Sequence, residues 1–152
     1  MEHKTSEQIN ELAAALAKAQ GAITGAVKDA TNPFFKSSYA DLASVWEACR
    51  RPLSTNNLAV VQLPSTVAAC VTVTTMLIHA SGQWISGSLS ATAKNAEPQS
   101  IGSAITYLKR YALQSIVGVA SEDDDANEST HRPAPLVRAV AKKHDVDDLP
   151  PF

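Results

Sequence analysis

The sequence predicts an α+β fold: N-terminal helices, a three-stranded antiparallel sheet, and a long helix packed on that sheet. Apolar residues recur at helical spacing before residue 50 and again after residue 100, whereas they alternate with polar residues between 58 and 93, as in strands. The chain has 152 residues and is 45% hydrophobic, which is enough for one buried core. Apolar periodicity is lost from Glu122 onward. We therefore expect one folded domain over residues 1–127, followed by a disordered tail.

The first helix is predicted by a capping pattern and the apolar stripe after it. Thr5 and Gln8 stand at the spacing of a capping box, in which each side chain accepts a hydrogen bond from the backbone N–H of the other residue. The apolar stripe consists of Ile9, Leu12, Leu16, Ile23 and Val27. Together these features predict a helix of about 20 residues.

A loop and a second helix follow. An Asn-Pro pair interrupts the first stripe and opens a loop over residues 32–38, in which two phenylalanines stand beside Lys36. Ser38 is expected to cap the second helix. That helix should end at residues 50–51, because Pro52 has no N–H to donate and its ring collides with the preceding turn.

Three strands are predicted over residues 58–63, 67–79 and 83–93. If the turn at 80–82 has three residues with Gly82 left-handed, the apolar side chains of the two strands that it joins share one face. The facing pairs are then Leu77 with Ile85, Val73 with Leu89 and Val71 with Ala91. The other face carries the hydroxyl groups of Thr72, Thr74, Ser86, Ser88 and Ser90. We expect water or another protein surface to cover it, because unpaired buried hydroxyls cost roughly a few kcal/mol each.

The last predicted helix begins near Pro98, a residue suited to the first helical turn. Its apolar arc should face the sheet and consists of Ile101, Ile105, Leu108, Ala112, Ile116 and Val119. A second stripe on the far side consists of Ser103, Tyr107, Arg110, Tyr111 and Gln114. At 100° per residue, Arg110 points directly away from the core and Lys109 lies on the opposite flank of the apolar arc.

Composition and spacing argue against several classes of protein. No apolar run approaches the roughly 18 residues of a membrane span, and the N-terminus lacks a signal-peptide core, so we expect a cytoplasmic protein. Cys49 and Cys70 lack metal-site spacing and are expected to be buried, reduced thiols. The four histidines are far apart, and neither a nucleophile motif nor a lysine-bearing phosphate loop is present. No catalytic residue, metal or cofactor is therefore predicted.

Cations and aromatic rings together predict nucleic-acid binding, because cations attract phosphates and ring faces stack on bases of any sequence. The candidate DNA-binding residues are Lys36, Tyr39, Arg50, Arg51, Lys94, Tyr107, Lys109 and Arg110. Simpler explanations exist for some of them. The two arginines at 50–51 would be stabilised by the dipole at a helix C-terminus. Tyr107 and Tyr111, four residues apart, could pack against another subunit.

The acidic run Glu122–Asp125 permits a second interpretation. Clustered carboxylates can hold the Mg²⁺ ions of phosphoryl chemistry, as in a metal-dependent nuclease. Consecutive acids rarely converge on one ion, however, and these follow a helix C-terminus, where the dipole disfavours negative charge. We therefore favour a role for the run in structure or assembly, such as pairing with basic residues of a neighbouring subunit.

Two runs of residues resemble the ERF (essential recombination function) family of phage single-strand annealing proteins. The first is NPFFKSSYADL at 32–42, and the second is GSAITYLKRYAL at 102–113, continuing through 118–120 to the acidic run. The resemblance covers residues 5–127. It implies a ring- or filament-forming protein that pairs complementary single strands without ATP. Leu108 stands where the family often has another basic residue, and since Leu108 lies on the core arc we expect no third cation there.

The C-terminal segment resembles a second kind of protein. Residues 128–144 are expected to form a flexible basic linker, and residues 145–152 an acidic, hydrophobic tip. The tip resembles the acidic end of bacterial single-stranded DNA-binding protein, which docks repair and replication partners, although here a second proline intervenes and Val146 interrupts the acidic run. The expected partner-binding residues are Asp147, Asp148, Leu149, Pro150, Pro151 and Phe152. An ordinary solvated tail is the alternative.

The residues predict nucleic-acid binding, and the family resemblance implies a protein that binds single-stranded DNA and anneals complementary strands during phage homologous recombination, in the cytoplasm of the bacterial host. Its expected partners are single-stranded DNA and further copies of itself in a ring or filament. If the C-terminal tip is a docking peptide, a host repair or replication protein is a third partner. Two alternatives are a metal-dependent nuclease built on the acidic run, and an oligomeric adaptor that presents its tip to host proteins.

Overall fold

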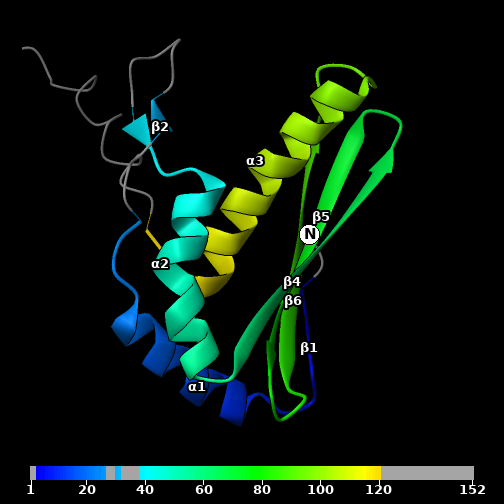
Figure 1. The fold of residues 1–152 in the computed structure, drawn as a ribbon. Helices are drawn as coiled ribbons and strands as arrows, with labels where there is room; N and C mark the ends of the chain where they lie inside the picture. Colours follow the sequence, from blue (N-terminus) through cyan, green and yellow to red (C-terminus); the bar gives the residue numbers. More distant parts are fainter. Residues whose placement is uncertain (1–2, 27–29, 32–37, 121–152) are drawn as a thin grey trace, which may run out of the picture.

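The computed structural model describes residues 3–26, 30–31 and 38–120 (Figure 1). Its elements in chain order are β1 (His3–Thr5), α1 (Asn10–Ala22), β2 (Ala30–Thr31), β3 (Ser38–Tyr39), α2 (Leu42–Thr55), β4 (Leu58–Val67), β5 (Cys70–His79), β6 (Trp84–Thr92) and α3 (Pro98–Val117). The predicted C-terminal tail lies outside the described residues.

The fold is α+β, as the sequence predicts. One antiparallel sheet has the strand order β1-β6-β5-β4, and the three helices lie on one of its faces, with α3 running along β5 and β6 (Figure 1). The sheet has four strands where three were predicted. The additional strand, β1, includes Thr5, so the predicted capping box is wrong. A three-residue strand has too little sequence to show a pattern of its own, and pairing with β6 defines it.

The hairpin of β5 and β6 has the predicted register. Leu77 faces Ile85, Val73 faces Leu89 and Val71 faces Ala91, and Gly82 has a φ of 87° in the three-residue turn. The side toward α3 buries Val71, Val73 and Leu77 completely. On the opposite side the hydroxyls pair across the strands, Thr72 with Ser90 at 2.8 Å and Thr74 with Ser88 at 2.9 Å. These four hydroxyl groups on that face are therefore hydrogen-bonded to one another in pairs.

The hairpin of β4 and β5 differs from the prediction. β4 continues to Val67, and a two-residue turn leads to Cys70, because Ala68 adopts a left-handed φ of 53°. No glycine marks this turn, so the sequence pattern did not show it. Pro64 lies within β4, and a proline is tolerated there because β4 is an edge strand.

Helix α1 is shorter than predicted and begins later, with no side-chain cap from its own sequence. Gln83, in the turn before β6, replaces that cap: its Oε1 accepts hydrogen bonds from the backbone N–H groups of Glu11 (2.8 Å) and Leu12 (3.0 Å). The helix ends at Ala22, before the last two residues of the predicted apolar stripe. A cap that comes from residue 83 cannot be read from local sequence.

Helix α2 corrects the predicted ends of the second helix. Asp41, not Ser38, is its N-cap, because the Asp41 carboxylate accepts hydrogen bonds from the backbone N–H (2.8 Å) and hydroxyl (2.9 Å) of Ser44. The helix also continues through Pro52 to Thr55. An internal proline costs about 3 kcal/mol, but continuation buries Leu53 in the core beside Cys49. The predicted burial holds for Cys49, whereas Cys70 is exposed.

Helix α3 is buried on two sides. Pro98 starts it and Leu108 packs on the sheet, both as predicted. Its C-terminal half also packs against α1 and α2 through Leu113 and Val117, which widens the buried surface beyond the predicted arc and includes Gln114 from the stripe expected to face outward. Within the described residues, no helix is long and apolar enough to cross a membrane.

Candidate nucleic-acid interface

The outer surface of α3 carries a stack of two tyrosines and one arginine. The ring centroids of Tyr107 and Tyr111 are 4.5 Å apart, with the planes tilted by 48°. The Arg110 guanidinium carbon lies 4.7 Å from the Tyr111 centroid and 5.8 Å from the Tyr107 centroid, within the range of a cation–π contact. Tyr111 is half-buried, but Tyr107 is 54% exposed. The Tyr107 ring is therefore exposed to solvent, and the Tyr111 ring and the Arg110 guanidinium group pack against it.

The helical position of Arg110 predicted a side chain that points directly away from the core. The structure shows a different orientation. Its Nη1 donates a hydrogen bond to the carbonyl oxygen of Ala40 at 3.1 Å, and the residue is half-buried. Helical geometry fixes only the direction of the Cα–Cβ bond, and the long side chain bends toward the segment that precedes α2. Arg110 thus joins α3 to the start of α2.

Asp41 lies at the same junction and is ionised at neutral pH. The backbone N–H of Ser44, followed by its hydroxyl, lowers the pKa of Asp41 below the ordinary carboxyl value, and the positive charge of Arg110 acts in the same direction. Because Asp41 already caps α2, the N-terminus of that helix is occupied and offers no further anion site.

Two shallow hollows flank Tyr107. One extends toward α2 and is lined by Arg110 and Asp41, and the other extends toward the end of β6 and is lined by Lys94. Gln99, Ser103 and Tyr107 line both. The exposed Tyr107 ring thus lies between two hollows, each with one cation in its lining, so the arrangement offers a stacking face with positive charge on both sides.

The remaining described candidates lie elsewhere. Lys109 is half-buried on the other flank of α3, where its carbonyl oxygen accepts a hydrogen bond from Gln62 Nε2 at 2.9 Å. Arg50 forms an exposed ion pair with Glu47 at 3.3 Å. Because α2 continues to Thr55, residues 50–51 do not end a helix, so the predicted stabilisation by a helix C-terminal dipole is wrong. None of these three cations lines either hollow.

Several predicted residues cannot be placed beside this site. Lys36, the acidic run at 122–125 and the tip at 147–152 lie outside the described residues. The backbone of Tyr39 pairs with Ala30 in the small sheet of β2 and β3, two residues before Asp41. Among the residues that the structure describes, no group of three or more His, Cys, Asp or Glu side chains lies close enough to hold a metal ion.

Sequence reasoning missed two polar residues of the site, Gln99 and Ser103, which line both hollows. Ser103 stood in the predicted outer stripe of α3, one helical turn before Tyr107, and that position was the available signal. Gln99 falls in the first turn of α3. Gln99 reaches the hollows because the loop between β6 and α3 places the start of α3 there, and no periodicity in the sequence specifies that loop.

The family model of the ERF superfamily matches residues 12–145. No curated protein and no solved structure matches the chain. The family match extends past the predicted domain boundary at 127, and that boundary stays a prediction.

Proposed function

The chain belongs to the ERF superfamily, a family of DNA recombination proteins, and from this membership we propose that it binds single-stranded DNA and anneals complementary strands without ATP. The setting would be phage homologous recombination in the cytoplasm of a bacterial host. Oligomers of the chain would present many such sites to one strand. The C-terminal tip would serve as a separate contact for a host repair or replication protein.

The observation that carries this proposal is the exposed ring of Tyr107 between two hollows. A base that stacks on Tyr107 gains about 1–3 kcal/mol irrespective of its identity, which suits a protein that must bind any sequence. Tyr111 and Arg110 hold the ring from beneath, at 4.5 Å between ring centroids and 5.8 Å from the guanidinium carbon to the Tyr107 centroid. Stacking occupies the base faces and leaves the pairing edges accessible to a complementary strand.

The two cations beside Tyr107 would have different roles. Lys94 is exposed in one hollow, whereas Arg110 in the other is partly engaged by Ala40 and the tyrosines. We therefore assign phosphate binding mainly to Lys94 and ring positioning mainly to Arg110. A site with so few cations binds weakly and with strong salt dependence, so annealing requires many copies on one strand.

No nucleotide hydrolysis is needed in this scheme, because base pairing between the two strands supplies the free energy. The protein has to concentrate strands and hold them with their bases accessible. The weak, sequence-tolerant contacts at Tyr107 allow a strand to shift until a complementary stretch is found. The protein then releases the DNA, because bases that are stacked inside the duplex can no longer stack on the tyrosine rings.

Annealing of two labelled complementary oligonucleotides, in EDTA and without ATP, tests the proposal. Wild type and Tyr107→Phe should anneal alike, since both keep a stacking face, whereas Tyr107→Ala should bind single strands about 5- to 150-fold more weakly, corresponding to the loss of one stacked base at about 1–3 kcal/mol. Normal annealing by Tyr107→Ala would reject this site. If wild type instead degraded the strands when Mg²⁺ was added, a nuclease would replace the annealing function.

A further inference from the structure

Among the described residues, neither edge of the four-stranded sheet is fully paired. β1 covers β6 only from Ile85 to Gly87, and no described residue pairs with the rest of that edge, Ser88–Thr92. At the other end of the sheet, β4 has no described partner beyond β5. Exposed edges join other chains readily because their N–H and C=O groups are unpaired.

The free half of β6 has its hydrogen-bonding groups directed outward at alternate residues. The backbone N–H of Ser6 donates to the carbonyl oxygen of Trp84 at 2.9 Å, so the even-numbered residues of β6 turn their peptide groups toward the β1 side. By the same alternation, Ser88, Ser90 and Thr92 offer theirs at the uncovered part of the edge. An added strand would find a regular ladder of donors and acceptors there.

The matching edge is the distal half of β4, Leu63–Val67. Every residue in it is exposed, and Leu63 and Val67 reach 56% and 80% exposure although both are apolar. Neither this half of β4 nor the free half of β6 contains a charged residue. Charged residues on such edges commonly keep sheets apart, and these two carry none. Pro64 in β4 has no N–H to donate, so the contact would have one donor fewer on that strand.

The two free halves also lie at the same level of the sheet. Through β5, Leu63 stands in one row with Thr74 and Ser88, and Ser65 stands in one row with Thr72 and Ser90. Both β4 and β6 run antiparallel to β5 and therefore parallel to each other. A second copy in the same orientation could thus place its β4 beside β6 in parallel, without sliding along the strand direction.

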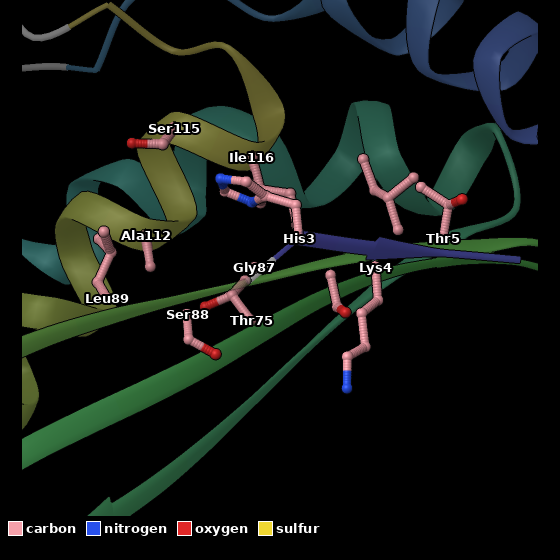
Figure 2. A pocket seen from close by; sticks show the side chains of 12 residues that line it. His3, Lys4, Thr5, Thr75, Gly87, Ser88, Leu89, Ala112, Ser115 and Ile116 are labelled. Atoms are coloured by element: carbon pink, nitrogen blue, oxygen red, sulfur yellow. The ribbon is translucent and has the colours of Figure 1, made fainter. Parts of the chain in front are cut away.

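A cavity beneath the β6 edge fits this addition. Figure 2 shows it between β6 and α3, with Leu89, Ala112 and Ile116 on its walls and His3 at one end, and its volume is about 400 Å³. A Cβ at Gly87 would come within 2.8 Å of Nδ1 of His3, so a larger residue there would displace the His3 side chain at that end of the cavity. Pro64 stands in one row with Val73 and Leu89. In the register above, Pro64 of the added strand would lie next to Leu89, over this apolar space.

We propose that copies of this chain join edge to edge, the distal half of β4 in one copy adding in parallel to Ser88–Thr92 of the next. The contact is head-to-tail, because each copy uses two different surfaces, and it therefore builds a ring or a filament. One continuous sheet would bring the α3 helices to the same side, with their Tyr107 rings in a row. The inference specifies the surfaces for the self-association included in the proposed function.

Sedimentation velocity of the full chain without DNA tests the edge with two matched variants. Ser90→Ala and Ser90→Pro both remove the hydroxyl that pairs with Thr72 at 2.8 Å, but only the proline removes the outward N–H. We expect wild type and Ser90→Ala to form the same oligomer and Ser90→Pro to shift to monomer, with circular dichroism showing that it stays folded. A monomeric wild type, or a folded Ser90→Pro with the wild-type oligomer size, would overturn the proposal.

Disulfide trapping gives a second test that does not depend on tolerance of proline. In a Cys70→Ser background, the double variant Ser65→Cys/Ser90→Cys cannot bridge within one chain, because β5 separates the two positions by about 9–10 Å, beyond the roughly 7 Å limit for the Cα atoms of a disulfide. Oxidation should produce a ladder of covalent oligomers from the double variant and nothing beyond dimers from either single variant. A double variant that stops at dimers would reject the parallel contact.

The outcome is separable from that of the annealing proposal. A ladder from a protein whose Tyr107→Ala variant anneals normally would support the edge contact and reject the DNA site. Conversely, if no ladder forms but Tyr107→Ala loses binding, the DNA site stands and the edge contact fails.

Discussion

The two sides of α3 are held by different kinds of interaction. Toward the sheet and the other helices, Leu108, Leu113 and Val117 are almost fully buried and belong to the core. On the outer side, Tyr107 is 54% exposed and is supported by a neighbouring ring and a guanidinium group. Packing fixes the inner side, whereas a few contacts fix the outer side. Substitutions on the two sides should therefore affect different measurements.

The largest expected effect is on stability, from the inner side. Leu113→Ala leaves a cavity at a fully buried position and should lower the free energy of unfolding by about 2–5 kcal/mol. Tyr107→Ala removes mainly an aromatic pair and should cost less than about 1.5 kcal/mol. Urea unfolding of both variants measures the difference. Equal losses would show that the outer ring is also part of the core.

A double-mutant cycle tests whether the outer stack acts as one unit. If Arg110 works by holding Tyr107, then Arg110→Ala and Tyr107→Ala should be coupled by about 0.5–3 kcal/mol in affinity for a labelled single strand. Arg110→Lys keeps the charge but loses the planar group, so its affinity should lie nearer to Arg110→Ala than to wild type. Additive effects, with wild-type affinity for Arg110→Lys, would assign Arg110 to phosphate binding instead.

Asp41 should link the outer side to acid stability. Loss of its N-cap in Asp41→Ala should cost about 0.5–2 kcal/mol at neutral pH. Because the pKa of Asp41 is lowered in the folded protein, its ionisation stabilises the fold above the ordinary carboxyl pKa and that contribution disappears as pH falls through the folded value. Asp41→Asn keeps a cap without the charge.

Urea unfolding across pH 7 to 2 should therefore show wild type more stable than Asp41→Asn at neutral pH, with the gap closing in acid. A gap that is unchanged by pH would mean that the charge of Asp41 contributes nothing.

The smallest expected effect is on salt dependence. Lys94→Gln should make the slope of log affinity against log salt concentration shallower by about 0.7, the value for one phosphate contact on single-stranded DNA. Arg51→Gln is a matched control, since Arg51 is also an exposed cation but lines neither hollow. Binding titrations at several salt concentrations measure both slopes. If Arg51→Gln changed the slope and Lys94→Gln did not, the DNA path would cross α2 instead.

The sequence was informative wherever one segment determines its own structure. The turn glycine at 82 and the alternation around it specified the register of β5 and β6, and the apolar arc of α3 placed Leu108 in the core. Predictions failed where tertiary contacts, not the local sequence, determine the structure. Pro52 is tolerated because Leu53 beyond it is buried, and Arg110 turns inward because Ala40 offers a carbonyl oxygen. For the candidate site, single residues were predictable, but their grouping around Tyr107 was not.

The hydrogen bonds from Glu11 and Leu12 to Gln83 connect the first helix to a turn some seventy residues later in the chain. The N–H groups of the first turn of α1 therefore have these partners only while the hairpin of β5 and β6 is closed. In hydrogen exchange, the amide protons of Glu11 and Leu12 should be released together with those that bridge His79 and Gln83 at the hairpin turn, and a Gln83→Ala variant should free the helix amides alone.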